Sequence, residues 1–133
     1  MKRETITQIT TDWIQMTHRT LSLKRIPSIE IRDLFRRTYE VLTRYHKEDM
    51  IPKELGEMLL EMDGFLYFAS MIGDKEFDDN PYLYQAVHSI AEALKNGFFE
   101  GRYEKEYPIL LADDANEKPY ALDLQNGYVE DLF

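Results

Sequence analysis

The sequence predicts a mainly α-helical fold, with about four helices in an antiparallel bundle and a small β-hairpin near the C-terminus. Three observations predict this fold class. Apolar residues recur at helical spacing in four long segments, proline and glycine residues separate these segments, and short alternating runs replace the helical pattern after residue 106. The connections between the helical segments are short, which favours antiparallel neighbours. We expect residues 1–133 to form a single domain.

The first helix is expected at about residues 4–24 and the second at about 28–48, with Pro27 between them. Ser28 suits the N-cap of the second helix because its hydroxyl can accept a free backbone N–H of the first turn. Each segment places its apolar residues on one stripe. The stripe residues are Ile6, Ile9, Trp13, Met16 and Leu23 in the first helix, and Ile31, Leu34, Phe35, Thr38, Val41, Leu42 and Tyr45 in the second.

The third helix is expected at about residues 52–73 and the fourth at about 81–99. Pro52 suits a first helical turn, Gly73 suits a helix end, and Asn80 followed by Pro81 suits a cap and first turn. In the second half of the third helix, apolar residues occupy the remaining faces as well, so we expect that half to be central in the bundle. These additional residues are Phe65, Tyr67, Phe68 and Met71.

The pattern after the fourth helix predicts a β-hairpin at about residues 107–124. A turn-rich segment at Asp113–Pro119 separates two apolar runs, and the second run alternates strictly. A third short strand is expected at Tyr128–Val129. Two strands alone are marginally stable in water, so the hairpin must pack on the helices or on another chain.

Six positions at the centre of the helical stripes are expected to be buried. A chain of 133 residues with 44% hydrophobic residues is sufficient for one core. The predicted core positions are Leu34, Leu42, Leu59, Leu66, Val87 and Leu94.

Composition excludes several classes of chemistry. The chain has no cysteine, which rules out disulfides, thiolate metal sites and thiol nucleophiles. No glycine-rich phosphate loop and no Gly-x-Ser-x-Gly motif is present. The N-terminus lacks the apolar run of a secretory signal, and no apolar run approaches the ~20 residues that span a bilayer. We therefore expect a cytoplasmic protein without a membrane segment and without a cofactor.

Charge is distributed unevenly along the chain. Residues 1–47 hold ten Lys or Arg and five Asp or Glu, for a net charge of +5, whereas residues 48–133 hold six and twenty, for a net of −14. The acidic excess disfavours phosphate backbones, which are bound by cations that displace counterions. We expect a protein partner with a basic surface, and we do not expect nucleic acid. A homo-oligomer is an alternative.

Two sets of residues could hold a metal. His18, His46 and His88 lie on different expected helices, but the Glu-x-x-His motif of helical metal sites is absent. The carboxylates of Glu54, Glu57, Glu76 and Asp79 form an E-x-x-E and an E-x-x-D pair. This spacing is similar to the magnesium-binding pattern of all-α nucleotide pyrophosphohydrolases and implies a magnesium-dependent nucleotide hydrolase as the alternative function.

The preferred hypothesis is a small acidic protein–protein interaction module: an inhibitor, an immunity or antitoxin-like protein, or an adaptor. It requires no catalytic residue, and we expect a binding protein rather than an enzyme. Nine tyrosines support it because tyrosine is enriched at interfaces. The candidate contact residues lie in expected loops and at the C-terminal end, where the tail either docks on a partner or closes the bundle. They are Asp78, Asp79, Asp113, Asp114, Glu117, Leu132 and Phe133.

Overall fold

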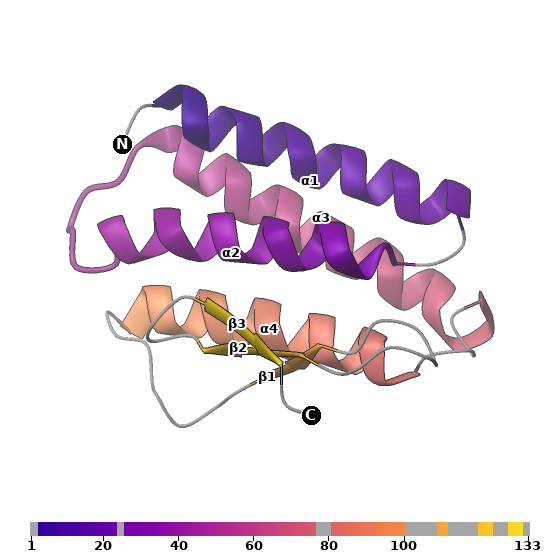
Figure 1. The fold of residues 1–133 in the computed structure, drawn as a ribbon. Coiled ribbons are helices and arrows are strands. Elements are labelled where there is room, and N and C mark those ends of the chain that lie inside the picture. The colour runs from indigo at the N-terminus through magenta and orange to yellow at the C-terminus, as the bar shows by residue number, and fades with distance from the viewer. Residues whose placement is uncertain are drawn as a thin grey trace.

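Four helices make up most of the described structure. The computed structural model describes residues 3–23, 26–76, 81–100, 109–111, 120–123 and 128–131. Within these residues the helices are α1 (Arg3–Leu23), α2 (Ser28–Tyr45), α3 (Lys53–Glu76) and α4 (Pro81–Glu100) (Figure 1). The prediction of a mainly helical fold with four helices is confirmed.

Three helix ends differ from the sequence predictions, the first being the C-terminal end of α2, which lies at Tyr45 and not at about residue 48. Pro27, not Ser28, is the N-cap of α2, and no side-chain hydrogen bond caps that helix. Its first turn closes through the backbone instead, because the amide of Ile31 donates to the carbonyl of Pro27 at 2.9 Å. The third helix does not end at Gly73 but continues to Glu76. A single glycine lowers helix stability without stopping the helix.

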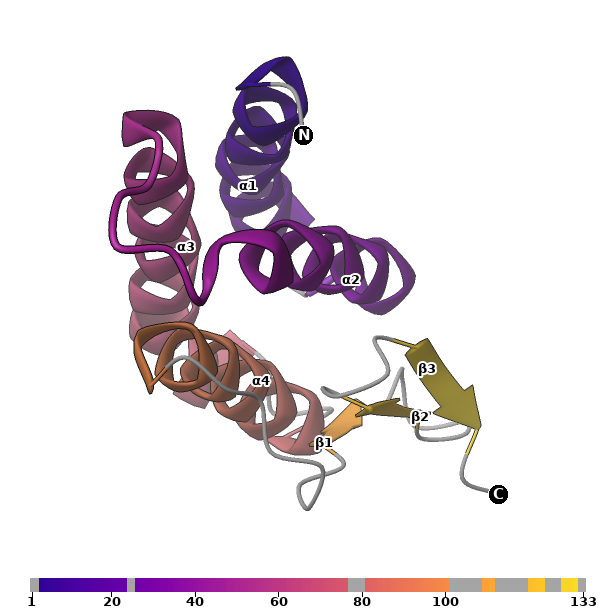
Figure 2. The same ribbon diagram turned by 90° about the vertical axis from the view of Figure 1, so that its left-hand side faces the viewer.

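The helices pack as a four-sided group in which α1 and α4 lie at opposite corners (Figure 2). Helix α1 packs against α2 and α3, and α4 packs against the same two helices. The α1–α3 contact is the most extensive of the helix pairs. Consecutive helices run in opposite directions, whereas the neighbours α1 and α3 run in the same direction (Figure 1). The connection from α2 to α3 therefore crosses between opposite corners of the group.

The core is centred on Trp13 of α1. Its ring contacts Phe35 of α2 edge-on at a centroid distance of 5.2 Å and Phe65 of α3 at 5.5 Å. The indole Nε1 donates to the hydroxyl of Thr38 at 3.0 Å, and that hydroxyl donates to the carbonyl of Leu34 at 2.8 Å. The indole N–H and the Thr38 hydroxyl are thus both hydrogen-bonded, which offsets the cost of burying these polar groups.

The six predicted core positions are all buried, which confirms them: Leu34, Leu42, Leu59, Leu66, Val87 and Leu94. Leu23, assigned to the buried stripe of the first helix, is instead 42% exposed. It is the last residue of α1.

Three short strands follow the helices. They are β1 (Ile109–Leu111), β2 (Tyr120–Asp123) and β3 (Tyr128–Asp131), paired antiparallel in the order β1-β2-β3. Ile109 pairs with Leu122, and Leu122 pairs with Val129 on its other side. Strand β1 lies beside α4. The expected turn of the hairpin falls within residues 112–119, outside the described residues, so the hairpin at 107–124 stays a prediction.

Candidate interaction surface

A network of charged side chains joins α1 to α2. Arg37 donates from Nη1 to Oδ2 of Asp12 on α1 at 2.7 Å, and from Nε to Oδ2 of Asp33 at 3.0 Å. Arg36 donates to the other oxygen of Asp33 at 2.8 Å, and Gln8 donates to Oδ1 of Asp12 at 3.0 Å. The side chains of Gln8, Asp12, Asp33 and Arg36 are thus joined by hydrogen bonds into one network around Arg37, at the contact, or seam, between the two helices.

Arg37 is held in its charged form by this network. Partial burial alone lowers the pKa of Arg37, but the hydrogen bonds to and charges of Asp12 and Asp33 outweigh burial and raise the pKa above its ordinary value. The pair with Asp12 also shows that α1 and α2 are antiparallel, because Arg19, farther along α1, pairs with the earlier residue Glu30 at 2.9 Å.

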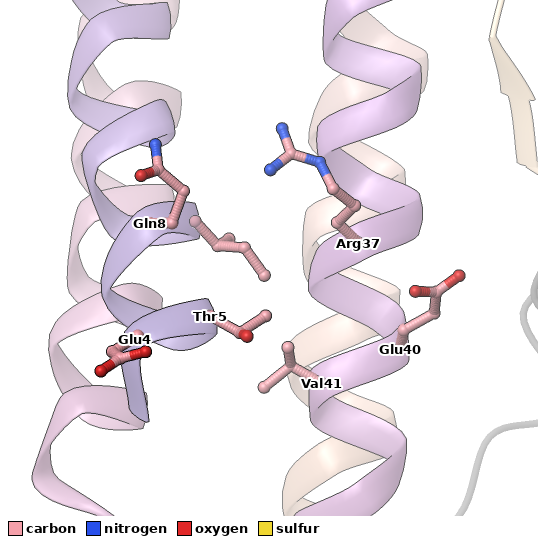
Figure 3. Close-up of a pocket in the computed structure, with 7 residues that line it drawn as sticks. Glu4, Thr5, Gln8, Arg37, Glu40 and Val41 are labelled. Carbon is pink, nitrogen blue, oxygen red and sulfur yellow. The ribbon is translucent and has the colours of Figure 1, made fainter. Parts of the chain in front are cut away.

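Two shallow pockets of about 350 Å³ each open on either side of Arg37. In the first, Thr5 and Val41 face each other across the gap between α1 and α2, while Glu4 and Glu40 extend away from it on opposite sides (Figure 3). Besides the Thr5 hydroxyl, the polar groups at this gap are those of Gln8 and Arg37, which already bind Asp12. A ligand would have to break these bonds, so the seam is a structural contact between helices.

The outer face of α3 is different, because it exposes large apolar side chains. Leu60 is 71% exposed, Tyr67 is 63% exposed and Phe68 is 42% exposed. Residues seven and eight positions apart lie on one side of a helix, so these three share a face. Figure 2 shows α3 at the edge of the helix group, with the other three helices on one side of it. We call Leu60, Tyr67 and Phe68, together with the glycine between them, Gly64, the α3 outer face.

Glycines Gly56 and Gly64 lie on this side of α3, one turn before and one turn after Leu60. A Cβ atom built on either glycine would meet nothing within 4 Å. Glycine inside a helix costs about 1 kcal/mol relative to alanine. Close packing within the described part of the chain therefore does not explain why glycine occupies either position. Without side chains at these two positions, the helix surface on either side of Leu60 is recessed.

A ridge of glutamates runs along one flank of the α3 outer face. Glu54, Glu57 and Glu61 follow one another at spacings of three and four residues, which aligns them along the helix. Among the residues that the structure describes, these three form no ion pair. On the opposite flank, Asp63 binds Nζ of Lys95 from α4 at 2.9 Å. Among the described residues, the first flank therefore has no paired cation, whereas on the second flank Lys95 pairs with both Asp63 and Glu92.

The structure places the described residues of the magnesium hypothesis along one helix. Glu54, Glu57 and Glu76 belong to the single continuous helix α3. At 1.5 Å per residue, the backbones of Glu54 and Glu76 are about 33 Å apart along the axis, so they do not converge on one metal ion. Across the described ranges of the chain, no group of three or more His, Asp or Glu residues is placed to hold a metal. Asp79 lies outside the described residues.

The loop and tail candidates also lie outside the described residues. They are Asp78, Asp79, Asp113, Asp114, Glu117, Leu132 and Phe133. Their proposed role in partner binding is an untested prediction.

The exposure of Leu60 was not predicted from the sequence, and Tyr67 and Phe68, which we expected to be central in the bundle, are also exposed. Phe65 and Leu66 of the same segment are buried, as expected. The sequence did carry a signal, namely apolar residues on several sides of the second half of α3. Such a segment is either enclosed by its own chain or covered by a partner on its outer face. Periodicity alone does not distinguish these two cases.

No family model, curated protein or solved structure matches this chain. Among the described helices, none combines the length and the apolar character needed to cross a membrane.

Proposed function

We propose that this protein is a small acidic protein–protein interaction module that binds a basic surface on its partner, as an inhibitor, an immunity or antitoxin-like protein, or an adaptor. The observation that supports this proposal is the α3 outer face. Exposed aromatic and leucine side chains beside uncompensated carboxylates are typical of a binding surface rather than of a solvated one. The polar seam at Arg37 carries no comparable feature.

In this proposal consecutive helices of the bundle are antiparallel and the C-terminal strands form a hairpin. Asp78 and Asp79 then lie between α3 and α4, and Asp113, Asp114 and Glu117 lie at the hairpin tip. Acidic loops attract a basic partner over long range and raise the association rate, with little effect on dissociation. The C-terminal residues Leu132 and Phe133 supply a further apolar contact.

The test is to capture the partner from cells, identify it, and measure its association with variants of the full chain. Replacing Asp78, Asp79, Asp113 and Asp114 with asparagine should lower the association rate and weaken its dependence on salt. The control variant replaces four exposed acids elsewhere with their amides: Glu4, Glu40, Glu48 and Asp49. Both variants change the net charge equally, so a larger effect of the first locates the attraction in the loops.

Two results would contradict the proposal. One is a partner whose binding surface is not basic. The other is an association rate that does not respond to ionic strength in the wild-type protein, because charge attraction between exposed groups is screened by salt.

A further inference from the structure

We propose that the α3 outer face docks a single amphipathic helix of the partner, one that carries lysine or arginine along one edge. This inference rests on the proposed function and specifies the site and the shape of the partner. It follows from three properties of the face: its exposed apolar side chains, the open space at its glycines, and the glutamates along one of its flanks.

The anchors lie at a spacing that another helix can contact. Leu60 and the pair of Tyr67 and Phe68 are two turns apart, roughly 11–12 Å along α3. The two rings touch edge-to-face at a centroid distance of 6.0 Å, which makes them a compact aromatic block. Exposed tyrosine, leucine and phenylalanine anchors at i and i+7 spacing are the pattern of helix-on-helix recognition.

The glycines favour a helix that lies close to α3. Nothing in the described chain fills the space above Gly56 and Gly64, so a partner side chain can settle between the ridges formed by Leu60 and Tyr67. A β-strand is a poor occupant, because strand addition requires a free sheet edge with unpaired backbone groups. The backbone groups in the interior of α3 are already bonded within the helix.

The charge on the two flanks selects a basic edge. Glu54, Glu57 and Glu61 form no ion pair among the described residues, whereas Asp63 on the other flank is paired with Lys95. A partner helix with cations along one edge therefore fits in one orientation only. Like charges placed opposite each other at an interface are unfavourable.

A second copy of this chain fits less well. If two α3 helices met face to face and antiparallel about a twofold axis, the glutamate ridge of each would lie along the ridge of the other. In the parallel arrangement each ridge would face the flank of Asp63, where the one cation, Lys95, is already paired with Asp63 and Glu92. Neither arrangement supplies the missing cations.

The test uses three labelled 18-residue peptides and the full-length chain. The first is an amphipathic helix of leucine and lysine, the second carries glutamate in place of lysine, and the third is a scrambled form of the first. Fluorescence anisotropy gives the Kd of each. We expect the leucine–lysine helix to bind at least tenfold more tightly than both of the others, with the amide signals of residues 56–68 shifting in NMR spectra.

Substitutions on the face should then weaken this binding. Leu60→Ser and Tyr67→Ser should each raise the Kd about tenfold, since truncation of an interface anchor commonly has this effect. Met50→Ser is the matched control, because Met50 is 88% exposed and lies before α3, away from the face. The double variant Glu57→Gln with Glu61→Gln should reduce the salt dependence of the Kd.

Gly64→Ala separates docking from folding. The added methyl group meets nothing inside the chain, so the variant should unfold at a higher temperature than the wild type and yet bind the peptide several-fold more weakly. An unchanged Kd would overturn the close approach that the proposal requires.

Three further outcomes overturn the proposal in different ways. Equal binding of the three peptides shows that the face does not select a basic helix. A dimer in sedimentation that Leu60→Ser dissociates identifies a second copy as the occupant. If a captured natural partner binds Leu60→Ser as tightly as the wild type, the docking site is wrong but the proposed interaction function still stands. If no basic partner is captured, the proposed interaction function itself is wrong.

Discussion

Helices α2 and α3 are both packed on one side, but their outer sides are made differently. The outer side of α2 exposes Arg36, Glu40 and Arg44, and the first of these is paired with Asp33 on the same helix. The outer side of α3 exposes leucine, tyrosine and phenylalanine. Both helices bury an apolar stripe against the core, but only α3 also has large apolar residues among its described exposed side chains.

This difference shows that burial within the bundle is not the reason for the apolar residues on the outside of α3. An exposed leucine by itself is ordinary on a protein surface. Three large apolar side chains on one face, beside glutamates that form no ion pair with another described residue, make a surface of the kind that marks a binding site. The comparison predicts that substitutions on the two sides of α3 have opposite consequences for folding and binding.

The largest effect is expected at the inner side. Phe65→Ala should lower the free energy of unfolding by about 3–5 kcal/mol, because Phe65 is buried against Trp13 and its removal leaves a cavity. Phe68→Ala, three positions on, should cost less than about 1 kcal/mol. Urea denaturation of both variants measures the contrast. Similar losses would mean that the two sides of α3 are not distinct.

A second inner position tests the depth of the core. Leu66→Ala should lower the free energy of unfolding by about 2–5 kcal/mol, since a buried leucine loses its apolar contacts and leaves a void. Chemical denaturation followed by circular dichroism gives the value. A loss below about 1 kcal/mol would show that Leu66 lies at the margin of the core.

A gain in stability is expected on the outer side. Gly64→Ala should raise the free energy of unfolding by about 0.5–1 kcal/mol, because alanine has less conformational entropy to lose in a helix and its methyl group enters open space. Thermal unfolding measures the shift. If the variant is destabilised, the space above Gly64 is occupied in the folded protein.

The smallest expected effect concerns the pair between α3 and α4. Burial alone lowers the pKa of Lys95, but hydrogen bonds to Asp63 and Glu92, together with their charges, raise it above 10.5 overall. A raised pKa stabilises the fold at pH values below the unfolded pKa, and this stabilisation is lost as the pH rises through the folded pKa.

The unfolding free energy of the wild type should therefore fall more steeply than that of Lys95→Met between about pH 10 and 12. Solvent screening keeps the difference below about 1 kcal/mol. Lys53→Met, which also removes one lysine, is the control, and denaturation at stepped pH measures the slopes. Parallel slopes for wild type and Lys95→Met would show that the pair does not stabilise the fold.

The magnesium hypothesis shows where local pattern was insufficient. The spacing of Glu54, Glu57 and Glu76 is compatible with two helices or with one. The structure places all three on α3, because Gly73 does not interrupt the helix. A single glycine lowers helix stability without stopping a helix, so the local pattern did not set the end of α3.

The sequence by itself determined the four helices and, apart from Leu23, the inner-stripe residues whose side chains the structure describes, because a period of 3.6 residues and the hydrophobic effect act on neighbouring residues. Leu34, Leu42 and Leu66 were predicted as core on this basis and are buried. Only the tertiary structure decided which helices are neighbours. The packing of α3 with α1 and α4 covers one side of α3, and Tyr67 and Phe68 are exposed because no other described helix lies on the opposite side.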